Sequence, residues 1–304
     1  MAARTRHTDI VVAPASTRLR TPWTRTTDLG AELHAALTWL RAPGLWRRVL
    51  PAIRAHLSAA PASTAYAFTL FITWWTLRGL GEAAQHRLIL SASTNLYNMR
   101  HNPLQVLVAS AFWTDGGFPW NTIVSFLIVM AAAERWLGTA RWILVYSAGH
   151  IGATLLIITG ISRAIDANLI PHRIGYASDV GTSYGFTAVL AVLAFRFTGA
   201  VRVAWVITLG VVLGLSAWEA PNFTNYGHIC AAIIGLIVAL VATTFWHFLD
   251  RAESLRRSGE HGGHGPEGDQ GHSPEDHQGH SPEGDRGHGS AGRRDNRPEG
   301  APTN

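Results

Sequence analysis

The chain has 304 residues, of which 47% are hydrophobic and only 15% are charged, and its net charge is +5. Residues 1–58 and 251–304 are polar, so the middle of the chain is far more apolar than the average suggests. Several stretches there approach the roughly 20 apolar residues that cross a bilayer core of about 30 Å, which excludes an ordinary soluble domain. The Arg residues cluster at the ends of these stretches, which indicates membrane topology and excludes a nucleic-acid-binding protein.

The use of basic residues and cysteine limits the class further. All 25 basic residues are Arg, which is typical of a GC-rich genome, and we predict a bacterial plasma-membrane protein. The single Cys230 lies inside a predicted span, so neither a disulfide framework nor a Cys-based metal site is available. No signal peptide is visible in residues 1–30. We predict no cofactor and no metal site in the apolar part.

Residues 1–58 form the first predicted segment, which ends in an amphipathic stretch. "GLWRRVLPAIRAHL" places its apolar residues on one helical face and most of its Arg residues off that face. Such a helix suits the surface of an anionic bilayer, with lipids as its partner. A soluble helix packed on loops of the same chain is the alternative.

Residues 59–250 form the predicted membrane domain, an all-α bundle of six transmembrane helices. The expected spans are 62–80, 119–134, 142–161, 181–197, 202–218 and 227–249. The long loop between the first two has an apolar piece of only ten residues, Leu104 to Trp113, which is too short to cross. We expect this loop to lie in the interface or to re-enter the bilayer.

The distribution of Arg predicts the orientation. Arg is frequent before the first span, after the second and fourth, and after the sixth, while the loop "WEAPNFTNY" has none. These Arg-rich segments should be cytoplasmic, so both termini are predicted to lie inside.

Two polar residues lie near the outer ends of parallel spans. Ser183 and His228 each lie two or three residues into a span, so helical rise places them within roughly 5 Å of the same depth. A hydrogen-bonded Ser and His form a nucleophile and its general base. A histidine in a span needs a partner, which favours function. The alternative is that Ser183 only packs between helices, as small polar residues do in membranes.

The same residues carry a family resemblance. "GTSYG" and "NYGHICAAIIGLIVAL" resemble the fourth and sixth transmembrane segments of the rhomboid family of intramembrane serine proteases. The family pattern G-x-S-G and a His with Gly seven residues later correspond to Gly181, Ser183, His228 and Gly235. "ERWLG" and the long first loop are also similar, so the resemblance covers roughly residues 60–250. It implies six helices, a Ser183–His228 catalytic dyad, and transmembrane helices as substrates cut near the outer face.

Two departures from the family pattern affect the expected chemistry. Tyr184 stands where the family has Gly directly after the serine, and its bulk is expected to restrict close approach there. The family's oxyanion side chains at the start of the second span have no clear equivalent, and Asn121 and Thr122 are the replacements in reach. An inactive rhomboid-like protein that binds transmembrane helices or holds partners is therefore the alternative function. A transporter would need a polar path through the midplane, which is not evident.

Three further polar sites have competing interpretations. Glu134 and Arg135 are a functional pair or, as we favour, a cap or loop-ordering pair. His150, near the middle of the third span, is a functional group or, as we favour, a buried histidine bonded to a neighbouring helix. The small residues around it predict close helix packing. Asp179 is expected to cap the fourth span rather than to act as a third catalytic residue.

The C-terminal segment, residues 251–304, differs in kind. "HGPEGDQG", "HSPEDHQG" and "HSPEGDRG" are successive octads with no aliphatic or aromatic residue. This composition cannot bury a core, so we predict a disordered tail. Its histidines and carboxylates suit weak binding of Zn, Ni or Cu, but low-complexity sequence without a role is the favoured interpretation.

Overall fold

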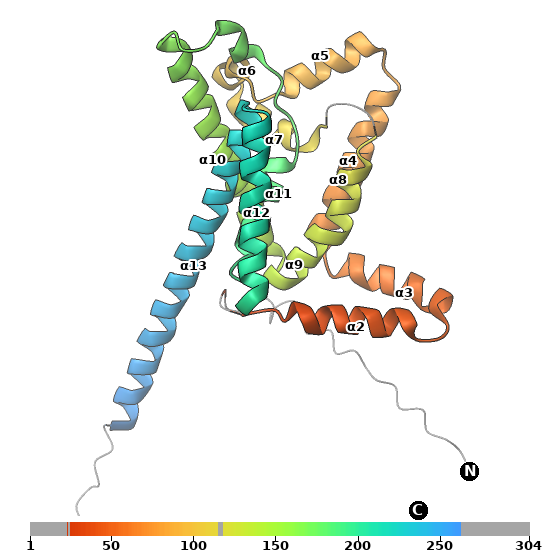
Figure 1. Ribbon diagram of the computed structural model, residues 1–304, viewed down its shortest axis with the longest axis vertical. Coiled ribbons are helices and arrows are strands. Elements are labelled where there is room, and N and C mark those ends of the chain that lie inside the picture. Colours follow the sequence, from red (N-terminus) through yellow and green to blue (C-terminus); the bar gives the residue numbers. More distant parts are fainter. Residues whose placement is uncertain (1–22, 24, 115–117, 263–304) are drawn as a thin grey trace, which may run out of the picture. The chain divides into compact units, whose positions relative to one another are not determined.

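The computed structural model describes residue 23 and residues 25–114 and 118–262, and every regular element in that part is helical (Figure 1). Three helices in it are long and apolar enough to cross a membrane: Thr139–Asp166, Gly199–Glu219 and Phe223–Leu249. The elements in chain order are α2 (Leu29–Arg41), α3 (Leu45–Ser58), α4 (Pro61–Arg78), α5 (Glu82–Ala92), α6 (Leu96–His101), α7 (Pro103–Phe112), α8 (Trp120–Ser125), η1 (a π-helix, Phe126–Met130), α9 (Ala131–Leu137), α10 (Thr139–Asp166), η2 (a 3₁₀-helix, His172–Tyr176), α11 (Ser183–Leu193), α12 (Gly199–Glu219) and α13 (Phe223–Gly262).

Each of the six predicted spans coincides with a helix or a continuous run of helices. The second span is built from α8, η1 and α9 without a break. The fourth departs most, because α11 is helical only over Ser183–Leu193 and is too short to cross a bilayer core alone. Most of α11 is buried, from Tyr184 to Leu193, so it is the inner helix of the bundle.

The N-terminal part is a helical hairpin of α2 and α3 (Figure 1). The predicted amphipathic helix is α3, and its apolar face is open: Trp46 is 89% exposed and Leu50 67%. Arg48 of α3 connects the two helices of the hairpin, because its side chain donates to the carbonyl oxygens of Trp39 and Ala42, both at 2.7 Å. The exposed apolar face agrees with a helix at a lipid surface.

The long first loop folds into three short helices, α5, α6 and α7. The apolar piece that was predicted not to cross is α7, and Tyr66 of α4 donates a hydrogen bond to the carbonyl of Ala111 in it. Thr73 of α4 donates to the carbonyl of Phe112 at 2.9 Å. The loop is therefore fixed against the first long helix.

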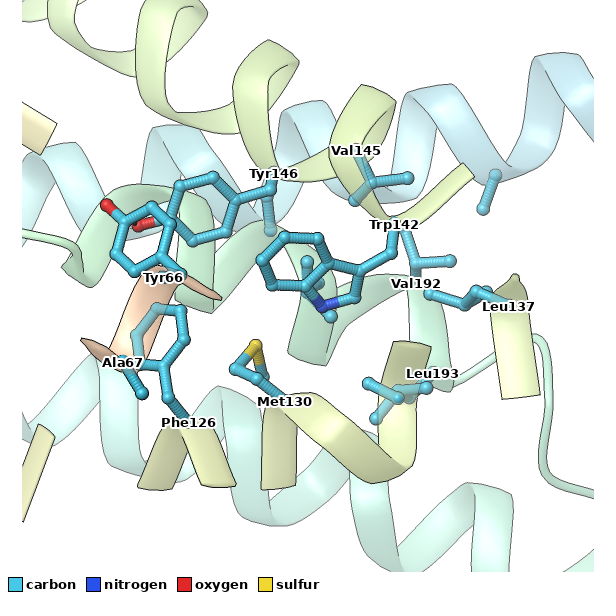
Figure 2. Packing of buried hydrophobic residues seen from close by; sticks show 14 of the residues in the cluster. Tyr66, Ala67, Phe126, Met130, Leu137, Trp142, Val145, Tyr146, Val192 and Leu193 are labelled. Atoms are coloured by element: carbon cyan, nitrogen blue, oxygen red, sulfur yellow. Dashed lines mark hydrogen bonds between the residues drawn. The ribbon is translucent and has the colours of Figure 1, made fainter. Parts of the chain in front are cut away.

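The main core is aromatic and joins four parts of the bundle (Figure 2). Tyr66 stacks on Phe126 with ring centroids 4.6 Å apart, and its hydroxyl accepts a hydrogen bond from Tyr146 at 2.7 Å. Trp142 stacks on Tyr146 one helical turn away, at 5.1 Å. Figure 2 shows these rings together, with Met130 and Leu193 continuing the cluster toward Leu137. The same Tyr146 proton is shared with the Thr182 carbonyl oxygen, 3.0 Å away, which connects the core to the start of α11.

Glu134 is a buried helix cap, in agreement with the favoured interpretation. Its carboxylate accepts hydrogen bonds from the amides of Ala62 and Ser63 at the start of α4, at 3.0 and 2.7 Å, and from the Thr139 hydroxyl at 2.7 Å. A carboxylate at a helix N-terminus is stabilised by the free amides and by the helix dipole. Arg135 points elsewhere, to His56 of α3 at 3.4 Å.

Glu134→Gln is expected to destabilise the protein. The amide keeps one acceptor oxygen but places an NH₂ group against the α4 amides, so about 2–3 kcal/mol of unfolding free energy should be lost. The thermal midpoint in detergent micelles measures this loss. Glu219→Gln, at an exposed end of α12, is the matched control and should change nothing. An unchanged midpoint for Glu134→Gln would show that this cap contributes little.

The boundary of the tail differs from the prediction. Residues 251–262, which composition assigned to the disordered tail, continue α13. They include Ala, Glu, Leu and Arg and contain no Pro, and these residues favour continuation of a helix. The octad repeats, from His264 onward, lie outside the described residues. The prediction that their histidines bind a metal weakly therefore stays a prediction.

Candidate active site

Close contacts with two glycines hold α11 between its neighbours. A Cβ on Gly149 of α10 would lie 2.2 Å from the Ala188 Cβ, and one on Gly235 of α13 would lie 2.3 Å from the Ala188 carbonyl oxygen. Both glycines therefore let a helix approach α11 at the same level. The predicted close packing around His150 and the small residue seven positions after His228 are both explained by this contact.

Ser183 is the first residue of α11 and its side chain is exposed. The turn before it needs glycine, because Gly181 has a φ of 137°. The Gly181 amide donates to the Ser110 carbonyl of α7 at 2.9 Å, which fixes the turn to the first loop. No side chain caps α11, so the first amides of the helix are available to a ligand.

His228 lies beside the residue that follows Ser183. The rings of Tyr184 and His228 are 5.3 Å apart in an edge-to-face arrangement. Tyr184 is buried, and room for it comes from Gly227, whose Cβ would lie 2.4 Å from the tyrosine ring. The bulk of Tyr184 was expected to restrict approach, but α11 and α13 still meet, because Gly227 of α13 leaves space for the tyrosine ring.

Asp179 does not cap α11, which corrects the sequence-based expectation. The N-cap residue is Thr182, and the Asp179 carboxylate instead accepts from the Tyr184 hydroxyl at 3.1 Å. The Thr94 hydroxyl lies 2.9 Å from the Asp179 carbonyl oxygen and 3.3 Å from its carboxylate, and shares its proton between them. Its own amide donates to Ser93 Oγ at 2.5 Å. Burial raises the pKa of Asp179, and the hydrogen bonds from Tyr184 and Thr94 act against that rise. The carboxylate therefore fixes the Tyr184 side chain, whose ring contacts His228.

In the described part of the chain, the Ser183 and His228 side chains are not joined by a hydrogen bond. The one hydrogen bond between a Ser and a His side chain among the described residues joins Ser110 Oγ of α7 and His150 Nε2 of α10, at 3.2 Å. Both are buried, and His150 Nε2 also lies 3.1 Å from the Leu107 carbonyl oxygen. His150 therefore links the first loop to α10, as the favoured interpretation of a histidine bonded to a neighbouring helix requires.

The two predicted oxyanion residues lie at the start of the second span, on α8. Asn121 is exposed and Thr122 is half-buried. Neither side chain forms a hydrogen bond in the described part of the chain. Both side chains have their donors available, and their role remains a prediction.

Sequence reasoning missed the contacts of Tyr184 with Asp179 and His228. The available signal was Gly227, the residue directly before His228, whose missing side chain leaves space for the tyrosine ring. Among the described residues no three His, Cys, Asp or Glu side chains gather as a metal site.

Comparison with known proteins gives the family. No curated protein and no solved structure matches the chain. The model of the family described as "Rhomboid-like protein" matches residues 55–244, which is more than half of the 304 residues and includes Ser183, Tyr184 and His228. The chain is an integral membrane protein that belongs to the Rhomboid-like protein family.

Proposed function

We propose that this protein is an intramembrane serine protease that uses Ser183 as the nucleophile and His228 as the general base. The observation that carries the proposal is the contact between the start of α11 and His228 of α13: the residue next to Ser183 packs on the imidazole at 5.3 Å. The exposed serine and the histidine therefore belong to one small region formed by two helices that glycines hold together.

The proposed chemistry uses these groups in order. His228 accepts the proton of the Ser183 hydroxyl as the oxygen attacks a substrate carbonyl, and the protonated imidazole then donates to the leaving amine. Water hydrolyses the acyl-enzyme by the same base. The uncapped amides at the start of α11 supply backbone donors for the oxyanion, and the helix dipole favours negative charge there.

Asn121 or Thr122 is proposed as the side-chain donor to the oxyanion. Loss of one such donor typically costs about 2.7–4 kcal/mol of transition-state stabilisation. The exposed amide of Asn121 offers two N–H donors, whereas the half-buried Thr122 offers one O–H. The proposed substrate is a transmembrane helix of another protein, which partly unwinds next to the outer end of α11.

The second candidate is a non-catalytic protein that binds transmembrane helices or holds partners. The specific observation in its favour is that Tyr184 packs on the His228 ring, whereas no hydrogen bond joins the Ser183 hydroxyl to that ring in the described part of α11 and α13. The Tyr184 hydroxyl is in turn held by Asp179. In this case the same glycine-lined surfaces serve only for helix packing.

We further propose that all six helical segments span the membrane and that both termini are cytoplasmic. The Arg-rich ends of α9, α11 and α13 support this orientation. A single Cys placed at exposed Arg173, in a Cys230→Ala background, should react with an impermeant maleimide added outside intact cells. A Cys at Arg54 should react only after the cells are opened. The reverse pattern would contradict the orientation.

A serine-directed probe tests the proposal without knowledge of the substrate. The full chain in lipid nanodiscs should react with a fluorescent fluorophosphonate, and Ser183→Ala should abolish the reaction while the thermal midpoint stays the same. Ser147→Ala, on α10, is the control and should keep the reaction. Absence of reaction in well-folded wild-type protein would favour the non-catalytic candidate.

A further inference from the structure

Arg196 is the largest fully buried side chain of the described residues, and it lies just beyond the end of α11. It is only 1% exposed. Its Nη1 donates to the carbonyl oxygen of Arg25 at 2.5 Å, and its own carbonyl accepts from the Thr27 amide at 2.7 Å. The segment that leads into α2 is thus attached to this arginine.

The charge of Arg196 has no counter-ion among the described residues. Its Nε and Nη2 are buried and make no hydrogen bond. The charged neighbours that act on it most are Arg141 and Arg25, which are cations like itself. A buried guanidinium without an acceptor is strongly unfavourable, since both the charge and the N–H groups lose their hydration. A bound anion would neutralise this charge and accept hydrogen bonds from Nε and Nη2.

An open cavity of about 820 Å³ lies beside Arg196. Arg25 and Arg135 also line it, together with Thr26 and Thr27. It contains three carboxylates, but two are already engaged: Asp28 accepts from the Ala31 amide of α2, and Glu134 caps α4. The third, Glu32, is exposed on the first turn of α2. The buried part of the lining is therefore left with an unpaired positive charge.

We propose that this cavity binds a phosphoryl group, with Arg196 and Arg25 as its cationic contacts. Guanidinium groups present forked donors that match phosphate oxygens, so two free nitrogens on one buried arginine suit this ligand better than a single halide. The cavity is larger than phosphate alone and has room for the group that carries it. The site is independent of Ser183 and His228.

Two sources supply that chemistry: the headgroup of an anionic lipid or a soluble phosphate ester. Lipid is within reach, because the exposed apolar face of α3 belongs to the same α2–α3 hairpin that lines the cavity. Phosphatidic acid and diacylglycerol differ only by the phosphoryl group, so this pair isolates its effect. Inorganic phosphate represents the soluble source.

The test measures the thermal midpoint of the full chain in maltoside micelles at constant ionic strength. Phosphatidic acid, and not diacylglycerol, should raise the midpoint by about 5 °C at a hundredfold excess over Kd. An equal rise with inorganic phosphate identifies a site for any phosphoryl group, and a rise with phosphatidic acid alone identifies a lipid site. Arg196→Met and Arg25→Met should each remove the rise, and Arg173→Met, at an exposed position outside the cavity, should keep it.

Two results would overturn the site. One is no rise of the wild-type midpoint with either phosphatidic acid or phosphate. The other is an undiminished rise in Arg25→Met, a variant that should fold because the Arg25 side chain is exposed. Arg25→Met therefore tests the proposed site even if Arg196→Met does not fold.

Discussion

Gly235→Ala is expected to destabilise the protein, although Gly→Ala in a helix normally stabilises by about 0.4–1 kcal/mol. The added Cβ would lie 2.3 Å from the Ala188 carbonyl oxygen and 3.0 Å from its Cα, both backbone atoms that cannot rotate away. The two helices must separate, and overpacking of this kind costs about 1–3 kcal/mol. The thermal midpoint should fall, and probe reaction at Ser183 should fall with it.

Gly214→Ala on α12 is the matched control. No atom lies within 4 Å of a Cβ at that position, so only the gain in helix propensity remains and the midpoint should rise. Two glycine substitutions of the same chemistry are thus expected to have opposite signs. A fall of similar size in both variants would contradict the close contact between α11 and α13.

Tyr184→Gly is expected to cost about 3–5 kcal/mol, since it empties a buried aromatic site. The ring of Tyr184 is 4% exposed and fills the space between Gly227, His228 and the small residues Ala153 and Ala231. The substitution restores the small residue of the family pattern but leaves a cavity. Its thermal midpoint should therefore drop sharply, whatever the effect on access to Ser183.

Tyr184→Phe separates the ring from the hydroxyl. It keeps the contact with His228 and loses the hydrogen bonds of the hydroxyl with Asp179 and Thr224, so a loss of about 1–2 kcal/mol is expected. Tyr226→Gly is the control for the larger change, because Tyr226 is 49% exposed on the first turns of α13. If Tyr184→Gly lost no more stability than Tyr226→Gly, the packing role of Tyr184 would be wrong.

The helical segments could be read from the sequence because the signals for them are local. Apolar runs with Arg or turn residues at their ends fix the position of a membrane helix, and each predicted span coincides with helical residues. Gly235 was marked by the resemblance to the rhomboid pattern, but its contact with Ala188 of α11 is known only from the structure. Whether all six segments cross the membrane stays a prediction.

The contacts of the candidate site could not be read in the same way, because they join residues far apart in the chain. Asp179 precedes a helix, as a cap does, yet it lies against Thr94, and nothing near either residue indicates the pairing. Arg196 ends an apolar stretch, as a topogenic arginine does, yet it is buried under the segment before α2. Local patterns place a polar residue in the chain but do not name its partner.

The most direct test of the central claim locates the adduct of a serine-directed probe. Wild-type protein is treated with a fluorophosphonate in nanodiscs and digested, and the modified peptide is identified by tandem mass spectrometry. The proposed function predicts an adduct on Ser183, and it predicts that His228→Ala lowers the rate of its formation at least about a hundredfold while the protein stays folded. An adduct on Ser110, which pairs with His150, or an unchanged rate at Ser183 in His228→Ala, would contradict the claim that His228 activates Ser183.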